Sequence, residues 1–113
     1  MIEKYGFGKI VIDGKTYNHD VIIFGDTVIP NWWRKKGHEL CVADLESAIE
    51  RFQPKIIVVG TGKFGLMRVL PEMMSYLQSL QIQLIVEKTQ QACEIYNQFS
   101  KKEKPLGAFH LTC

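Results

Sequence analysis

The amino-acid sequence predicts an α/β fold of three layers, with a mixed, mainly parallel central sheet flanked by helices and an N-terminal antiparallel β-hairpin part. Residues 56–59 form a wholly apolar, β-branched run, which is typical of a strand covered on both faces in a parallel sheet. Helical and strand patterns alternate from residue 44 onward, as in folds that place helices over such a sheet. Residues 9–29 instead carry short strand patterns joined by tight turns, which favour antiparallel pairing.

Size and composition predict one domain, residues 1–113, with an ordinary globular core. Apolar residues make up 46% of the chain and charged residues 23%, and the net charge of +2 is too small to indicate a nucleic-acid or membrane surface. No apolar run approaches the roughly 20 residues that cross a bilayer, and no secretory signal is visible. Three widely spaced cysteines favour a reducing compartment. We therefore expect a cytoplasmic protein without a membrane partner. The sequence does not predict its oligomeric state.

Two tight turns organise the N-terminal strands. Asp13 and Gly14 separate two strand patterns and predict a type I′ hairpin, because that turn needs positive φ angles. Gly25 and Asp26 form a second turn between residues 21–24 and 27–29. These connections are too short for parallel crossovers, so the strands are expected to pair antiparallel.

Residues 31–43 are irregular and combine aromatic with basic side chains. Two adjacent tryptophans, Trp32 and Trp33, precede three basic residues that begin at Arg34. Because neighbouring side chains of an extended segment point to opposite faces, we expect only one tryptophan to enter the core. Trp33, Arg34 and His38 are then a candidate binding surface or pocket, and contact with nucleic acid is a weaker reading. The alternative is a buried tryptophan that anchors a solvated basic loop, with Arg34 stacked on a ring.

Three helices are expected after this segment. The first runs over residues 44–52 with Asp44 as its cap, and the second begins at Pro71, where a missing N–H costs nothing. Thr89 is expected to cap the third helix. Strand patterns cover residues 82–86 and 106–111, whereas residues 66–70 fit neither pattern clearly.

The run at residues 56–59 leads into a glycine-rich loop. Its glycines have the spacing G-x-G-x-x-G, which with Glu87 near the end of the next strand is close to a dinucleotide fingerprint. That motif should open a helix, but the best helix start is Pro71, and the chain lacks a second nucleotide-binding half. A smaller anion held by the loop is the open alternative, and so is a purely structural role. The candidate ligand-binding residues are Gly60, Thr61, Gly62, Lys63 and Gly65.

No catalytic group is evident elsewhere. His110 and Cys113 face opposite ways on an expected strand, and no acidic residues are paired by spacing alone. No cysteine or histidine spacing indicates a metal site. We therefore expect no metal and no cofactor, and we lean against an enzyme without settling the question.

Motifs along nearly the whole chain resemble those of a known family. They are Gly14-x-x-Tyr17-x-x-Asp20, Trp33-Arg34 with Gly37-His38, Gly60-Thr61-Gly62, Thr89-x-x-Ala92 with Tyr96-Asn97, and His110-Leu111-Thr112-Cys113. The chain resembles the small single-domain family that includes the adipogenesis-associated domain protein of animals and the mitochondrial complex I assembly factor numbered three. The resemblance implies a three-layer α/β fold, no established enzyme activity, assembly through protein contacts, and a pocket at the glycine loop.

Two functions follow as expectations. The first is a non-enzymatic interaction or assembly-factor-like domain with a protein partner of unknown identity. The alternative is a binder of a small anionic molecule, or an enzyme, that uses the glycine-rich loop after the central strand. The visible N-terminus has no targeting segment, which argues against a mitochondrial location.

Overall fold

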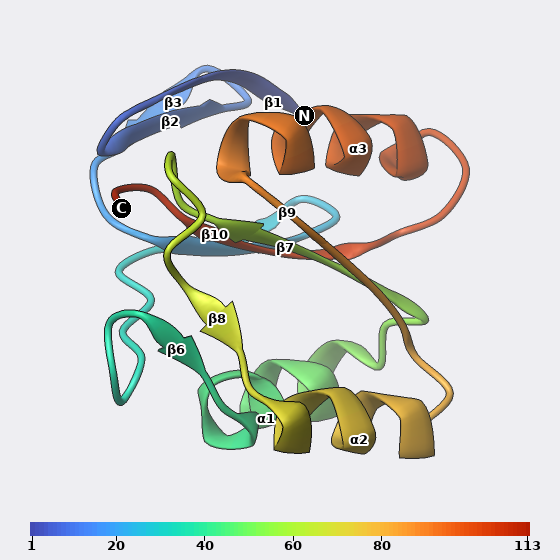
Figure 1. Ribbon diagram of the computed structural model, residues 1–113. Helices are drawn as coiled ribbons and strands as arrows, with labels where there is room; N and C mark the ends of the chain where they lie inside the picture. Colours follow the sequence, from blue (N-terminus) through green and yellow to red (C-terminus); the bar gives the residue numbers. More distant parts are fainter.

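The computed structural model describes residues 1–113 and shows three layers (Figure 1). A three-stranded sheet and helix α3 form one outer layer, a five-stranded sheet lies in the middle, and helices α1 and α2 form the other outer layer. The elements are β1 (Ile2–Gly6), β2 (Lys9–Ile12), β3 (Lys15–Tyr17), β4 (Val21–Phe24), β5 (Thr27–Ile29), β6 (Glu39–Leu40), α1 (Val42–Phe52), β7 (Ile56–Thr61), β8 (Arg68–Val69), α2 (Pro71–Ser79), β9 (Gln83–Glu87), α3 (Thr89–Ser100) and β10 (Leu106–His110). None of the helices is long and apolar enough to span a membrane.

The central sheet is mixed and has the strand order β5-β4-β10-β7-β9. Strands β10, β7 and β9 are parallel, and β4 and β5 extend the sheet with antiparallel pairing. Strand β7 lies between two parallel neighbours, and all six of its residues are buried. The predicted fold class is therefore confirmed, and the apolar run at residues 56–59 is explained by burial of both of its faces.

The side chains of β7 alternate between two separate cores. Ile57 and Val59 face α1 and α2, whereas Ile56 and Val58 face α3 and the N-terminal sheet. This alternation is the period-two geometry of a strand. Because its residues belong to both clusters, β7 connects the two halves of the hydrophobic core. Each of its fully buried aliphatic side chains contributes roughly 1.5–3 kcal/mol relative to an exposed one.

The N-terminal sheet has the predicted hairpin and one strand that was not predicted. Asp13 and Gly14 have φ angles of 48° and 81°, as a type I′ turn requires. Strand β1 was missed because Glu3 and Lys4 interrupt its apolar pattern. Its first residue is held instead by α3, since the Asn97 side chain accepts from the Ile2 N–H at 3.0 Å and donates to the Ile2 carbonyl at 2.7 Å.

Two predicted helix caps were wrong, and one helix start was correct. Helix α1 begins at Val42 after Cys41, and Asp44 lies within the first turn, where it accepts the Cys41 N–H at 2.9 Å. Helix α3 has Lys88 at its N-cap, and Thr89 is its first residue. The Thr89 hydroxyl does not cap the helix, because it bonds to Gly62 and to the His110 carbonyl. Helix α2 begins at Pro71 as predicted.

The two adjacent tryptophans are divided between core and solvent, as predicted. Trp32 is 5% exposed and donates from Nε1 to the Asp44 carbonyl at 3.0 Å, whereas Trp33 is 73% exposed. The Arg34 guanidinium lies 4.8 Å above the Trp32 ring. The buried tryptophan therefore anchors the loop and also carries a stacked arginine.

Candidate functional site

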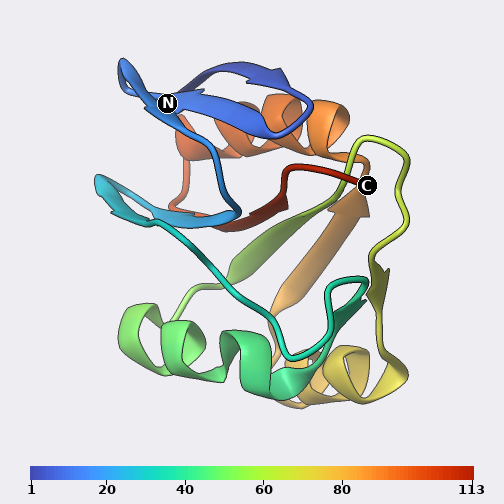
Figure 2. The same ribbon diagram turned by 90° about the vertical axis from the view of Figure 1, so that its left-hand side faces the viewer.

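The glycine loop leaves the carboxyl end of β7 and is packed tightly against the end of the chain (Figure 2). A Cβ atom on Gly62, whose φ is +102°, would overlap the carbonyl carbon of Cys113 and lie 2.6 Å from its oxygen. A Cβ on Gly60 would lie 2.8 Å from Thr89 Oγ1 and 2.9 Å from the Phe109 ring. Close approach of neighbouring segments therefore requires glycine at both positions.

Most of the loop N–H groups donate to atoms of the protein itself. The bonds run from Gly62 to Thr89 Oγ1 at 2.8 Å, from Lys63 to the Thr112 carbonyl at 2.7 Å, from Gly65 to the Gly62 carbonyl at 3.3 Å and from Leu66 to the Cys113 carbonyl at 3.0 Å. Among these consecutive residues, only the Phe64 N–H has no partner. An anion-binding loop presents several converging N–H groups, and this loop presents one. Anion binding at the loop stays a prediction.

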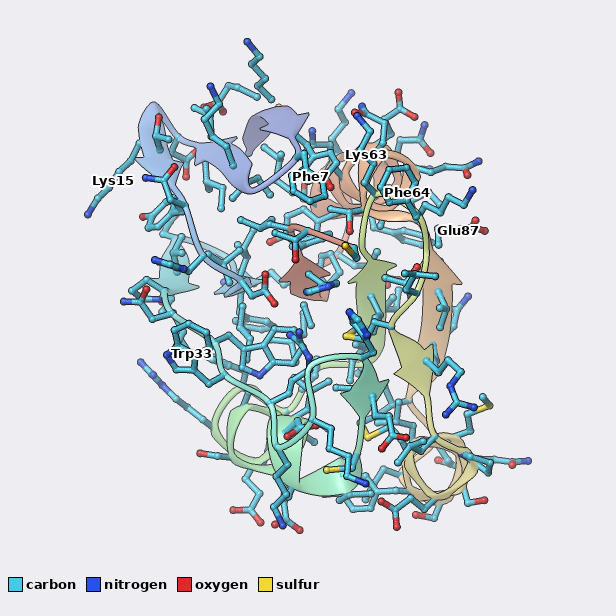
Figure 3. The ribbon with its side chains drawn as sticks, turned by 60° about the vertical axis from the view of Figure 1, so that its left-hand side comes forward. Phe7, Lys15, Trp33, Lys63, Phe64 and Glu87 are labelled. Carbon is cyan, nitrogen blue, oxygen red and sulfur yellow. The ribbon has the colours of Figure 1, made fainter.

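Exposed apolar side chains gather around the same loop. Phe7, from the β1–β2 turn, lies against Phe64 with ring centroids 6.5 Å apart, and the two residues are 52% and 59% exposed (Figure 3). Phe64 also lines an open cavity of about 510 Å³ together with Met74 and Val86, and Thr61 and Gly65 contribute to its wall. We call Phe7, Phe64, Met74 and Val86 the apolar surface.

The border of the apolar surface is charged. Lys63, Glu87 and Lys88 form no salt bridge, whereas Arg68 pairs with Glu39 at 3.3 Å. The aliphatic part of the Lys88 side chain packs over Gly65. A Cβ atom added to Gly65 would lie 3.3 Å from Lys88 Cγ. Two free ammonium groups against one free carboxylate give the border a positive excess.

The other candidate residues, Trp33, Arg34 and His38, lie together in a second cavity of about 340 Å³. Its wall also contains Asp20 and His110, and it shares no residue with the cavity beside the glycine loop. We call this second cavity the polar pocket. The structure thus brings Trp33, Arg34 and His38 together in one cavity, whereas only Thr61 and Gly65 of the glycine-loop candidates line the other.

A buried ionic network forms one side of the polar pocket. Asp20 Oδ2 accepts from Arg34 Nη1 at 2.7 Å and lies 2.8 Å from His110 Nδ1, and Asp20 Oδ1 accepts the Leu111 N–H at 2.8 Å. Arg34 also donates through Nε and Nη2 to the Gly37 carbonyl, at 3.2 and 2.8 Å. The side chains of Arg34 and Asp20 are 4% and 14% exposed, so this pair of opposite charges is satisfied within the protein.

Two opposing effects set the pKa of Asp20. Burial acts to raise the pKa of this carboxyl group, because it disfavours the charged form. Hydrogen bonds from His110, from the Leu111 N–H and from Arg34 outweigh burial, and the pKa of Asp20 lies below its ordinary value. Asp20 is therefore ionised at neutral pH.

Sequence reasoning missed Asp20 and His110 as partners because 90 residues separate them. They meet because β4 and β10 are antiparallel neighbours, with Val21 opposite Phe109. Asp20 directly precedes β4, and His110 ends β10. The position of each residue at a strand end could be predicted from the sequence. No local pattern indicates that these two strands pair with each other.

The fold and these two sites define a small α/β domain whose candidate residues lie near the ends of the strands of a mixed sheet, with no group of three or more side chains arranged to hold a metal ion. Residues 2–110 match the model of the family described as "Protein of unknown function (DUF498/DUF598)". The chain belongs to this family.

Solved structures share this fold over nearly the whole chain. A conserved hypothetical protein from Pyrococcus horikoshii OT3 has 26% identity and a TM-score of 0.85, with 100% of this chain and 99% of that chain covered. A Bartonella henselae protein described as an outer membrane protein has 17% identity and a TM-score of 0.81, covering 99% and 94%. A Bordetella pertussis protein described as a Mth938-like domain has 18% identity and a TM-score of 0.75, covering 98% and 85%. The last two show likeness of fold alone.

Proposed function

We propose that the chain is a non-enzymatic interaction domain of the assembly-factor type, which binds a partner protein through the apolar surface beside the glycine loop. The observation that carries the proposal is the contact between Phe7 and Phe64, which are both more than half exposed. Aromatic side chains are enriched at protein interfaces, where they bury a large area on binding.

The charged border indicates the chemistry of the partner. Lys63 and Lys88 have no acidic partner in the chain, so a partner with apolar side chains flanked by carboxylates would complement this region. The resemblance to a family that includes a mitochondrial assembly factor supports the same kind of function. We place the protein in the cytoplasm, without a cofactor.

The alternative is a small anionic ligand at the glycine loop. Gly62, Lys63, Gly65 and Leu66 already use their N–H groups within the protein, which leaves the Lys63 ammonium and the Phe64 N–H for a ligand. The internal bonds of the loop therefore favour the interaction domain over the anion binder.

Affinity capture from an extract of the source cells tests the proposal with a matched pair of variants. Phe7→Ser/Phe64→Ser removes the aromatic contact, and Leu80→Ser removes an exposed apolar side chain of similar exposure, 46%, at the end of α2. We expect one stoichiometric partner that the wild type and Leu80→Ser capture and that the double variant loses. Equal capture by all three proteins contradicts the proposal.

Thermal unfolding with phosphate, nucleotides and phosphorylated metabolites tests the alternative. A ligand at 100 times its dissociation constant should stabilise the fold by roughly 2.7 kcal/mol. Stabilisation by such a ligand, abolished by Lys63→Ala, combined with no stoichiometric protein partner, would favour the anion binder.

A further inference from the structure

The polar pocket contains the side chains of all three histidines of the chain. Its cavity of about 340 Å³ is of the size that small ligands occupy, and His19, His38 and His110 all line it. Arg34 and Asp20 form hydrogen bonds with each other and with neighbouring groups of the protein, so they are part of the wall. The imidazoles are the groups left to contact a ligand. This pocket is separate from the apolar surface.

The hydrogen-bond geometry fixes the tautomer of His110. Nδ1 lies 2.8 Å from Asp20 Oδ2, and an ionised carboxylate has no proton to donate. The proton between them therefore belongs to Nδ1. Arg34 Nη2, at 3.0 Å from the same nitrogen, then faces an N–H and cannot donate to it. A neutral His110 ring thus carries its lone pair on Nε2.

That lone pair is poorly satisfied within the protein. The sole partner of Nε2 within the protein is the hydroxyl of Thr112 at 3.5 Å, the outer limit of a hydrogen bond. His110 is 5% exposed, and both His110 and Thr112 line the pocket. Nε2 is therefore an acceptor in the pocket wall that is free to take a stronger hydrogen bond from a ligand.

The rest of the pocket favours a flat ligand. Trp33 is 73% exposed, lines the cavity and lies 5.6 Å from the His19 ring, which gives one side an aromatic wall. Asp20 is the only carboxylate in the wall, and its charge is already paired with Arg34. An aromatic ring therefore has a stacking surface, and a negative charge on the ligand meets no unpaired acid.

We infer that the polar pocket binds a small planar molecule with an acidic hydroxyl group, of the phenol or enol class, and that His110 Nε2 accepts the hydroxyl proton. The ligand O–H bond breaks and the Nε2–H bond forms, and the electron pair stays on the ligand oxygen. The products are an imidazolium, which Asp20 stabilises through Nδ1–H, and a phenolate or enolate hydrogen-bonded to Nε2–H. Trp33 stacks on the ring of the ligand. The transfer is reversible and needs no further reactant.

4-Nitrophenol is a suitable probe because its phenolate absorbs visible light and its phenol form does not. At a pH where free 4-nitrophenol is mostly protonated, adding the wild-type protein should raise the phenolate absorbance until the site is saturated. His110→Gln should lower the ratio of bound phenolate to bound phenol by at least about tenfold, the loss expected for one charge-assisted hydrogen bond. No saturable rise with the wild type, or a full rise with a folded His110→Gln variant, overturns the inference.

Thr16→Val, in the exposed strand β3, is the matched control and should keep the full rise. The wild type also provides a test that depends on no variant, through the ¹⁵N chemical shifts of the His110 ring. In the free protein Nδ1 should be protonated and Nε2 bare, and saturating 4-nitrophenol should protonate Nε2. A free protein with Nε2 protonated and Nδ1 bare, or an Nε2 signal unchanged at saturation, overturns the inference.

Discussion

The polar pocket and the apolar surface lie near the strand ends of one sheet, but their side chains are held in opposite ways. In the polar pocket Asp20, Arg34 and His110 come from three distant segments and are almost fully buried as a bonded network. On the apolar surface Phe7 and Phe64 lie against each other, and each is more than half exposed to solvent (Figure 3). The buried network of the polar pocket contributes to the stability of the fold, whereas the exposed side chains of the apolar surface contribute little to it.

This difference decides which substitutions separate binding from stability. Removing one member of a buried ionic network leaves its partners charged and unpaired, which is costly. Removing an exposed aromatic side chain takes little apolar area out of the folded core. Changes in the buried network and its supports should therefore lower the free energy of unfolding strongly, and changes on the apolar surface should leave it nearly constant.

Asp20→Ala should have the largest effect, a loss of about 4 kcal/mol in the free energy of unfolding. The substitution leaves Arg34 and His110 without their carboxylate and leaves the Leu111 N–H without its acceptor. Urea unfolding followed by circular dichroism measures the loss. Glu50→Ala is the control, because it removes an exposed carboxylate that has no ion pair. Equal stability of the two variants would show that the network does not support the fold.

Gly62→Ala should cost about 3 kcal/mol, from a strained φ of +102° together with the overlap with Cys113. Gly37→Ala is the matched control, since a Cβ at Gly37 would meet nothing within 4 Å. Thermal and urea unfolding of the two variants measure the difference. A Gly62→Ala protein as stable as Gly37→Ala would mean that the C-terminal residues do not pack against the loop.

Thr89→Val should cost about 2 kcal/mol. The buried Thr89 hydroxyl accepts the Gly62 N–H at 2.8 Å and donates to the His110 carbonyl at 2.6 Å, so it connects the glycine loop to the strand that carries His110. Valine keeps the shape and leaves both groups without this partner. Thr16→Val, on an exposed strand, should change stability little, and urea unfolding compares the two. An equally small effect at Thr89 would show that these two hydrogen bonds do not stabilise the fold.

Acid should weaken the network through Asp20. Because the folded pKa of Asp20 is lowered, its contribution is fully present above the unfolded value near 3.8 and is lost as the pH falls through the lower folded pKa. The stability advantage of the wild type over Asp20→Asn should thus shrink as the pH falls below about 3.8. Urea unfolding of both proteins at a series of pH values tests this. Parallel curves down to strongly acidic pH would show that the ionised Asp20 is not specially stabilised.

The sequence was sufficient for the architecture wherever a local pattern decided the structure. The buried run of β7, the Asp13-Gly14 turn and the start of α2 at Pro71 each follow from side-chain chemistry over a few residues. Strand β1 was not predicted, because its apolar pattern is interrupted. It is held by α3 through Asn97, a contact across 95 residues.

The candidate sites were predictable only in part. Trp33, Arg34 and His38 are close in the sequence and do share one cavity. The pairing of Asp20 with His110 depends on which strands become neighbours, and the contact of Phe7 with Phe64 joins a turn of one sheet to a loop of another. Tertiary packing creates both pairs, so no spacing within the sequence indicates them.

The central claim is that the apolar surface is available to a partner protein because the fold does not need it. The most direct test is the free energy of unfolding of Phe7→Ser/Phe64→Ser relative to the wild type, measured in urea with the isolated proteins. We predict a change within about 0.5 kcal/mol, as for exposed positions outside the core. A loss of about 2 kcal/mol or more would show that the two rings belong to the core of the fold and would contradict the account.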